Sequence, residues 1–503
     1  MKEEKSLKRR IIENLFFSET TAIISRIGAL IFTIIVARIF MPELFGVYSL
    51  ALTIILSIWV LSDLGLGSTI TRYLSESIGK NKKPEARSRF LFLLKTKLLL
   101  SIITSILLFL FAGIVAGFFK KPELILPLKI GSIYLFLNTL YNLSTAVFLS
   151  FQKVKYSAIG EAIFQISKII FLVVLVFFVK SVEGIFIVLS LSLILSLGFS
   201  TGVIAKKFSS IIKGKKIPVE RKRMIKFSGF LAMSSMTLLI FANVDKLVLG
   251  YYLSTEFVGF YNAILTVVVG VIGIFGISPS FFPVFTQLNG EKLRNAFRKI
   301  FHYLSIIAFP ATVGLAFIIV PLLKILYGVA YVPPEYEFSI FLASLFLTLL
   351  ILESTFSSIY KVLLDADEKP NIPAWTLSGT SILNLVLNII LVASLAKINP
   401  SYGLIGASLA TFVSRYLGMF IFIHFAGKTM KVFPMKASIF KPLLASLLML
   451  GYLFLFKLVI PLSLVAGIIM ILSAALIYFT ILFLIKGLSF GEIKQLFNRG
   501  HKS

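Results

Sequence analysis

The sequence contains no cysteine and only three histidines among its 503 residues. Disulfide bonds and thiolate metal sites are therefore excluded, and few imidazoles remain to bind a metal, so we expect no metal site and no cofactor. Acidic residues are also scarce, with 22 Asp and Glu against 50 Lys and Arg, which gives a formal charge of +28. Polar sequence in general is in short supply, because 58% of the residues are hydrophobic and the mean hydropathy is +0.98. These values lie far above those of globular proteins, so nearly the whole chain is expected to lie in lipid.

Sequence motifs of several enzyme classes are missing as well. The chain has no GxxxxGK[ST] phosphate-binding loop, so it is not its own ATPase, and it has no HExxH or GxSxG motif. The connections expected on the non-cytosolic side are short and leave no room for a catalytic domain there. We therefore expect a protein that is not an enzyme.

Apolar runs with few charges recur along the chain, each long enough for a helix of about 20 residues that crosses the membrane. The pattern predicts an all-α polytopic membrane protein of about fourteen transmembrane helices. The expected spans are 14–40, 45–75, 90–118, 125–150, 157–179, 183–205, 226–252, 257–287, 299–326, 338–363, 372–396, 402–427, 437–459 and 462–485.

The positive charges follow the membrane topology. Counted from the N-terminus, roughly 33 Lys and Arg fall in the even-side connections and tails and about five in the odd-side ones, which is the positive-inside pattern. Both termini are therefore expected in the cytosol and the protein in the cell membrane, with the lysines and arginines contacting lipid headgroups and not nucleic acid. No small-residue cleavage site follows MKEEKSLKRR, so the first apolar segment is expected to be retained.

One short segment occurs twice. ELFGVYSLALT at 43–53 and EFVGFYNAILT at 256–266 share Glu, Gly, Tyr and Thr at a displacement of 213 positions. Together with weaker matches, this predicts two six-helix lobes in parallel repeat plus a C-terminal helix pair. The expected domains are 1–210, a basic cytosolic linker at 211–225, 226–430, and two extra helices with a cytosolic tail at 431–503.

Charged side chains inside the predicted helices are the best functional signal, because charge at membrane depth is costly and usually faces a bundle interior or an aqueous cavity. Arg26 lies about a dozen residues into the first span, where its guanidinium could grip a phosphate bidentately. Arg72 lies nearer a helix end and could instead reach headgroups. The other candidate bases are Lys168, Lys246 and Arg415, and the candidate coupling or structural acids are Glu19, Asp63, Glu161, Asp245 and Glu353.

Several of these residues could instead serve the packing of the helices. Glu161 and Lys168 lie on one helix face, and they or Glu353 with Arg415 could neutralise each other inside the bundle. Asn384 and Asn388 form a stripe with Ser381, which fits interhelical hydrogen bonds or recognition of sugar hydroxyls.

Three segments carry a resemblance to a known family: ARIFMPELFGVYSLALTIILSIWVLSDLGLGSTITRYLSE, VDKLVLGYYLSTEFVGFYNA, and LNLVLNIILV with GLIGASLAT. They resemble the polysaccharide-biosynthesis, Wzx-type flippases of the multidrug/oligosaccharidyl-lipid/polysaccharide exporter superfamily. The resemblance covers roughly residues 10–430. It implies an alternating-access flippase that carries a polyprenyl-(pyro)phosphate-linked oligosaccharide from the cytosolic to the outer leaflet, with Arg26, Arg72 and Lys246 in candidate positions for the phosphate.

Two other functions stay open at this point. Glu19 and Asp245 are acids in the first helices of both predicted lobes, as an ion-coupled multidrug antiporter of the same superfamily would need. A polytopic glycosyltransferase or glycan polymerase is the second alternative. Under the flippase interpretation the expected partners are the lipid-linked oligosaccharide, membrane lipids, a coupling cation and glycan-assembly enzymes.

Overall fold

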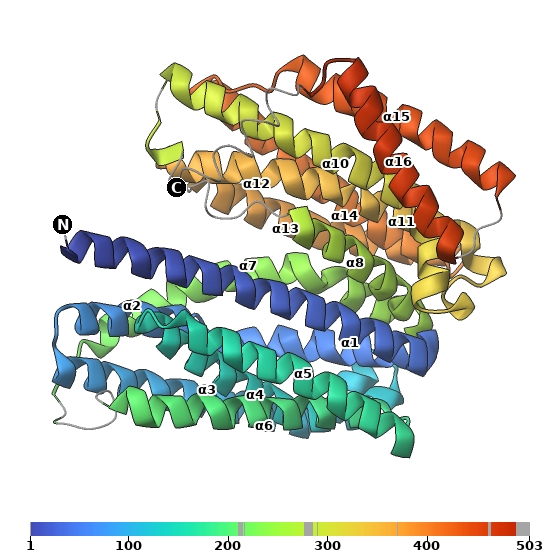
Figure 1. The fold of residues 1–503 in the computed structure, drawn as a ribbon. Helices are drawn as coiled ribbons and strands as arrows, with labels where there is room; N and C mark the ends of the chain where they lie inside the picture. The colour runs from blue at the N-terminus through green and yellow to red at the C-terminus, as the bar shows by residue number, and fades with distance from the viewer. Residues whose placement is uncertain are drawn as a thin grey trace. The chain divides into compact units, whose positions relative to one another are not determined.

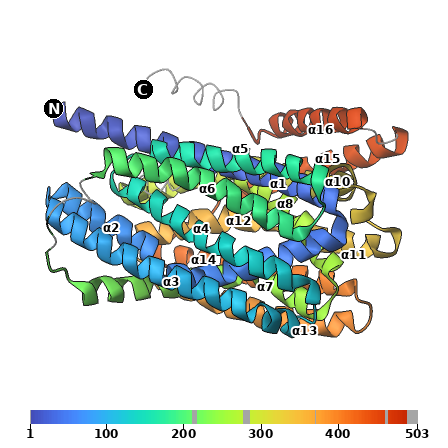
Figure 2. The ribbon, with the colours of Figure 1, turned by 90° about the horizontal axis from the view of Figure 1, so that it is seen from below.

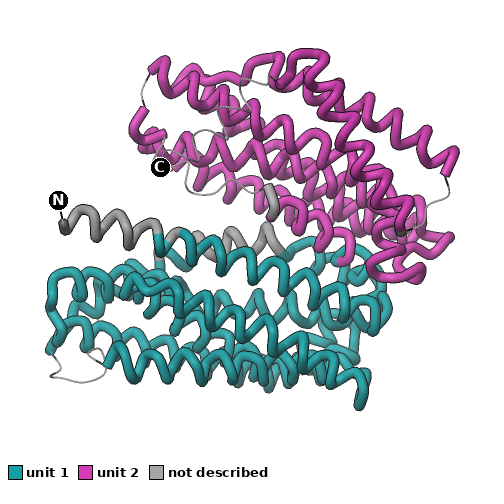
Figure 3. The backbone as a smooth tube through the Cα atoms, viewed as in Figure 1, with its two compact units in different colours: residues 1–262 teal, residues 263–503 magenta. Residues whose placement is uncertain are grey.

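The computed structural model describes residues 2–209, 215, 217–275, 285–288, 290–369, 371–460 and 464–488. Over these residues the chain is helical and contains no strand, which confirms the predicted all-α fold. The chain divides into two compact units, residues 1–262 and 263–503 (Figure 3). Parts of the predicted linker at 211–225 and the tail beyond 488 lie outside the described residues. The lobe boundaries given above stay a prediction.

Unit 1 is built from long helices that pack lengthwise (Figure 1). Within it, α4 lies between α3 and α6, and α5 packs against both α6 and α1. Its helices are α1 (Lys2–Asp63), α2 (Leu66–Gly79), α3 (Lys83–Phe118), α4 (Ile125–Ser150), α5 (Val154–Phe178), α6 (Val182–Lys207), α7 (Arg221–Tyr252) and the first turns of α8 (Thr255–Phe275).

Unit 2 is also helical, and its most extensive contact joins α13 to α14. The last two helices form a pair, α15 and α16, which lie next to each other in Figure 2 and reach the rest of the unit through α10. The helices are α10 (Gly290–Leu326), α11 (Glu337–Thr348), α12 (Leu350–Ala366), α13 (Asn371–Ala396), α14 (Tyr402–Met430), α15 (Lys436–Val459) and α16 (Leu464–Leu484).

The described helices are long and apolar enough to cross a membrane many times. Twelve candidate spans meet the criteria of length and hydropathy. The first of them, Phe16–Gly79, has 64 residues; at 1.5 Å per residue it would be about 96 Å long and therefore holds two passes. With α7, which is 32 residues long, the total agrees with the fourteen helices expected from the sequence. The chain is a multi-pass membrane protein.

The helix breaks differ from the predicted ones in two places. The predicted boundary near residue 41 is present as a kink, where Met41 has φ 59° and Pro42 follows. The predicted helix 45–75, however, is wrong as a single element, because Leu64 and Gly65 both have positive φ and end α1. A Cβ on Gly65 would lie 2.8 Å from the backbone oxygen of Ser228, so this break is suited to glycine. The predicted helix 338–363 is likewise divided, at Leu349.

A buried ion pair joins α1 to α3 just before this break. Lys97 Nζ lies 2.6 Å from Asp63 Oδ1, and the exposed fractions of the two side chains are 0% and 19%. Asp63 was among the acids that the sequence placed inside the membrane helices. The sequence did not identify Lys97 as the residue that neutralises it. When one member of a buried ion pair is removed, the other charge stays buried and uncompensated. This costs far more folding free energy than the loss of an exposed ion pair.

We predict that Lys97→Met lowers the free energy of unfolding by about 3 kcal/mol, because Asp63 then remains charged without its partner. The double variant Asp63→Asn/Lys97→Met should recover much of this loss. Thermal unfolding of the detergent-purified protein measures both. As a control, Arg223→Gln breaks the exposed ion pair with Glu220 and should cost less than about 1 kcal/mol. Equal melting temperatures for Lys97→Met and the wild type would contradict the assignment.

Candidate functional site

Two charged residues lie on an exposed face of α1. Glu19 and Arg26 are both exposed, and because they are separated by two helical turns they lie on the same side of α1. Ile23 and Ile27 on this side are 51% and 54% exposed. This exposed face of α1, defined by these four residues, combines a carboxylate, a guanidinium and apolar side chains within the first candidate membrane span.

The opposite face of α1 packs against a buried polar cluster on α5. Glu161, Gln165 and Lys168 are 8%, 4% and 5% exposed, and they share one face as their spacing predicts. Glu161 accepts hydrogen bonds from the Tyr141 hydroxyl on α4, at 2.8 Å, and from Gln165 Nε2, at 2.6 Å. A Cβ on Gly28 of α1 would lie 2.5 Å from Gln165 Oε1. The glycine therefore lets α1 and α5 approach closely.

Lys168 is held mainly by aromatic rings. Its Nζ lies 4.9 Å from the ring centroid of Phe32 and 5.1 Å from that of Phe164, so cation–π attraction stabilises the ammonium group. Because Phe32 belongs to the buried side of α1, Lys168 and Arg26 lie on opposite sides of that helix. The structure does not bring these two candidate bases together.

The other candidate bases of unit 1 lie on α2 and α7. Arg72 is exposed, and its guanidinium lies 4.4 Å from the ring centroid of Phe227 on α7. Asp245 on α7 is 6% exposed and accepts a hydrogen bond of 2.6 Å from the Tyr261 hydroxyl on α8. Lys246, its neighbour, is half-buried. The acid is thus fixed inside unit 1, while Arg72 keeps an accessible guanidinium.

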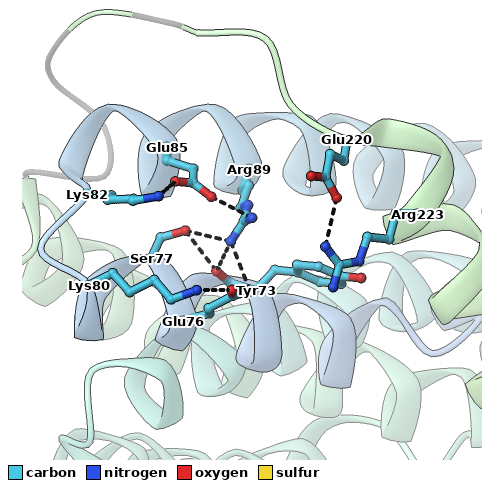
Figure 4. A network of polar contacts seen from close by, with 9 residues as sticks. All are labelled: Tyr73, Glu76, Ser77, Lys80, Lys82, Glu85, Arg89, Glu220 and Arg223. Atoms are coloured by element: carbon cyan, nitrogen blue, oxygen red, sulfur yellow. Dashed lines mark hydrogen bonds and ion pairs between the residues drawn. The ribbon is translucent and has the colours of Figure 1, made fainter.

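Arg89 is one of the lysines and arginines that the sequence analysis counted on the predicted cytosolic side and expected to contact lipid headgroups, and the structure gives it a structural role. Its side chain is 8% exposed and forms ion pairs with Glu76 on α2 and Glu85 on α3. It also donates hydrogen bonds to the backbone oxygen of Tyr73, at 3.2 Å, and to Ser77 Oγ, at 2.9 Å (Figure 4). This network connects the end of α2 to the start of α3 and leaves the Arg89 guanidinium unavailable to a headgroup.

In unit 2, Glu353 and Arg415 form an ion pair, which is one of the two roles that the sequence left open for them. Arg415 Nε lies 2.8 Å from Glu353 Oε2, and Ser357 donates a hydrogen bond of 2.6 Å to the other carboxylate oxygen. Glu353 is 4% exposed, whereas 34% of the Arg415 side chain is exposed. Arg415 therefore neutralises a buried acid and presents part of its side chain at the surface of unit 2.

Of the two asparagines of α13, Asn384 forms interhelical hydrogen bonds, one of the two roles that the sequence allowed, and Asn388 forms a hydrogen bond within its own helix. Asn384 Nδ2 lies 3.1 Å from both Thr411 Oγ1 and Ser414 Oγ on α14. Asn388 Nδ2 donates to the backbone oxygen of Asn384 at 3.0 Å. Both asparagines are at most 1% exposed, so they belong to the α13–α14 packing.

The two copies of the repeated segment contact each other within unit 1. A Cβ on Gly46 would overlap a backbone oxygen beside the other segment, and so would a Cβ on Gly259. Asn262 Nδ2 donates to Ser49 Oγ at 3.0 Å. Gly46 with Gly259, and Ser49 with Asn262, are equivalent positions displaced by 213 residues. We call this contact the glycine crossing; sequence repetition identified its residues but not their contact.

Unit 2 contains an apolar pocket of about 420 Å³ beside the C-terminal helix pair. α10 forms one wall with Ile306, Pro310 and Gly314, and the rest of the lining comes from α15, α16 and Val271 of α8. Among the described residues, no group of three or more His, Asp or Glu side chains could hold a metal ion.

Comparisons with known proteins agree with this architecture. The sequence profile of the family described as polysaccharide biosynthesis protein matches residues 35–334. Among curated proteins, a sequence comparison finds no significant match.

Solved structures give the fold. The lipid II flippase MurJ in an inward closed conformation matches with a TM-score of 0.74 and 21% identity over 93% of this chain and 98% of that one. An inward-facing multidrug resistance MATE family transporter of the MOP superfamily matches with a TM-score of 0.65 and 15% identity, over 81% of this chain and 96% of that one. The Vibrio cholerae MATE transporter VcmN matches with a TM-score of 0.54 and 11% identity, over 85% and 99%.

At these identities the structural likeness establishes the fold and leaves the substrate to other arguments. The sequence profile covers more than half of the chain. The chain therefore belongs to the polysaccharide biosynthesis protein family, and its fold is that of the MurJ flippase and the MATE transporters.

Proposed function

We propose that the protein is a flippase that carries a polyprenyl-(pyro)phosphate-linked oligosaccharide from the cytosolic to the outer leaflet by alternating access. Membership of a polysaccharide biosynthesis family supports a glycan as part of the substrate. A glycan cannot cross hydrocarbon unaided, and its anionic linker needs cationic partners that bind it differently in two states of the protein.

The proposal depends mainly on the exposed face of α1. Glu19 and Arg26 are exposed in a helix that crosses the membrane. A charge in contact with hydrocarbon is expensive, so such residues face a bundle interior or a water-filled cavity. We therefore assign this face to an aqueous cavity in which Arg26 receives the phosphate, with Arg72 and Lys246 as further cationic partners.

The remaining candidates receive supporting roles. Lys168, Arg415 and Asn384 form contacts between helices, and Asn388 is buried and bonded to the backbone of its own helix. We therefore assign all four to holding the helices in place. The apolar pocket beside α15 and α16 has a lining suited to part of a polyprenyl chain. A coupling cation would act through the acids, among which Asp245 is buried and accepts a hydrogen bond from Tyr261.

The glycine crossing suggests how the protein changes state. Equivalent positions of a two-fold repeat contact each other only near the axis that relates the copies, where rotation displaces atoms least. We propose that the predicted lobes rock about this crossing, so that the cavity opens to the two sides in turn. The cytosolic termini and the cell-membrane location that the charge distribution predicts are part of the same proposal, as are enzymes that assemble the glycan before and after flipping.

Reconstitution tests the function directly. We expect purified protein in proteoliposomes to make a labelled polyprenyl-pyrophosphate oligosaccharide accessible on the opposite leaflet, without moving a cationic dye in the same vesicles. Dye efflux without glycolipid movement would contradict the flippase and favour the ion-coupled antiporter. Glycosyl transfer by the purified protein would instead favour an enzyme.

Arg26→Ala is predicted to reduce glycolipid flipping at least about tenfold, because a charge-assisted hydrogen bond to phosphate is worth about 1.5–3 kcal/mol. The melting temperature should stay close to that of the wild type, since the side chain is exposed. Arg38→Ala is the matched control, as Arg38 is also an exposed arginine of α1 but lies nearer its kink. Equal flipping by the Arg26→Ala variant and the wild type would remove Arg26 from the site.

A covalent bridge across the glycine crossing is predicted to leave flipping intact. Ser49→Cys and Asn262→Cys can be joined by a short bis-methanethiosulfonate cross-linker, which leaves a reducible disulfide bond at each thiol, and no native cysteine competes. Flipping before and after cross-linking measures the effect. Arrest of flipping on cross-linking, reversed when the bridge is reduced, would show that the segments must separate and would refute the pivot.

Gly259→Ala should damage folding because of the close backbone contact at the glycine crossing. Gly202→Ala, with no atom near its added Cβ, should be tolerated.

A further inference from the structure

A second groove in unit 2 lies on α10, α11 and α15 and differs in character from the apolar pocket. It has a volume of about 750 Å³. Most of its wall is apolar, with Val313, Phe317 and Val320 on α10, Phe341 on α11 and Phe454 on α15. The Phe317 and Phe454 ring centroids are 4.9 Å apart, so the two helices meet along the groove.

All the charge of the groove gathers at one end. Lys324 lies in the last turn of α10, Glu337 is the first residue of α11, and Lys457 lies in the last turn of α15. Lys324 Nζ is 3.2 Å from Glu337 Oε1, and the side chains are 36% and 48% exposed. Lys457 is also exposed. Two ammonium groups against one carboxylate leave this end of the groove positive.

The length of the groove fits one leaflet of a membrane. Along α10 the lining extends from Thr312 to Lys324, which at 1.5 Å per residue is about 18 Å. Half of a hydrocarbon core is about 15 Å thick. Phe338 and Phe454 in the lining are 64% and 55% exposed. The groove is therefore amphiphilic, with an open apolar length that ends in a cationic mouth at the depth of headgroups.

We infer that this groove holds a resident anionic diacyl phospholipid. The phosphate lies against Lys324 and Lys457, and an acyl chain follows the apolar wall toward the middle of the membrane. Charge complementarity selects an anionic headgroup over a zwitterionic one, because Glu337 offsets only one of the two lysines. In the predicted topology the mouth faces the outer leaflet. This inference is independent of the solute that the protein transports.

Native mass spectrometry of the full-length protein, after delipidation and titration with phosphatidylglycerol or phosphatidylcholine, tests the site. The wild type should bind phosphatidylglycerol more tightly. Lys324→Gln/Lys457→Gln should weaken phosphatidylglycerol binding by about 25-fold, at roughly fivefold for each lysine, and leave phosphatidylcholine binding little changed. Ala316→Trp, which fills the apolar length, should weaken both lipids. Lys397→Gln removes an exposed lysine of unit 2 outside the groove and should have no effect.

Two results would overturn the inference. One is the same phosphatidylglycerol affinity in the double lysine variant, the Ala316→Trp variant and the wild type. The other is displacement of phosphatidylglycerol by an equimolar polyprenyl phosphate with the same dependence on Lys324 and Lys457, because the groove would then belong to the transported lipid.

Discussion

The structure depends on one constraint, which is the cost of placing charge and unpaired polar groups in hydrocarbon. Each charged residue at membrane depth must have a partner or face water. Asp63 is paired with Lys97, Glu353 with Arg415, and Glu161 receives hydrogen bonds from Tyr141 and Gln165. Lys168 lies against two aromatic rings. These contacts tie helices of each unit together. On α1, Glu19 and Arg26 differ from these residues in being exposed.

This division of α1 into two faces links packing to the proposed transport. The Gly28 side is closed by α5, so that face is fixed within unit 1, while Glu19 and Arg26 stay exposed. In the proposed mechanism, the repeated segment contributes the other requirement of an alternating cavity, which is a contact that does not have to break. At Gly46 and Gly259 the backbones are too close for any larger residue, so side-chain volume determines the sequence there. Repetition of this motif thus has a physical reason that is independent of substrate chemistry.

Composition and hydropathy predicted the all-α fold, the number of helices and the common face of Glu161, Gln165 and Lys168, because these depend on period and length alone. They did not predict the break at Leu64 and Gly65, since glycine is also frequent inside unbroken transmembrane helices. Lys97 was not identified as a buried partner because it lies only a few turns from the basic start of α3. In the sequence it therefore resembles the lysines and arginines that determine topology. Which side of α1 carries Arg26, and which partners each charge has, required the packing of α1 against α5.

The most direct test of the account asks whether water reaches the exposed face of α1. Since the chain has no cysteine, Ile23→Cys places a single thiol between Glu19 and Arg26. Ile114→Cys places a single thiol on the apolar surface of α3, at a residue that is 69% exposed. The account predicts that a membrane-impermeant maleimide labels position 23 in reconstituted protein and does not label position 114, because only the first lies in an aqueous cavity. If neither position is labelled, this face of α1 contacts lipid or protein, and the proposed cavity is contradicted.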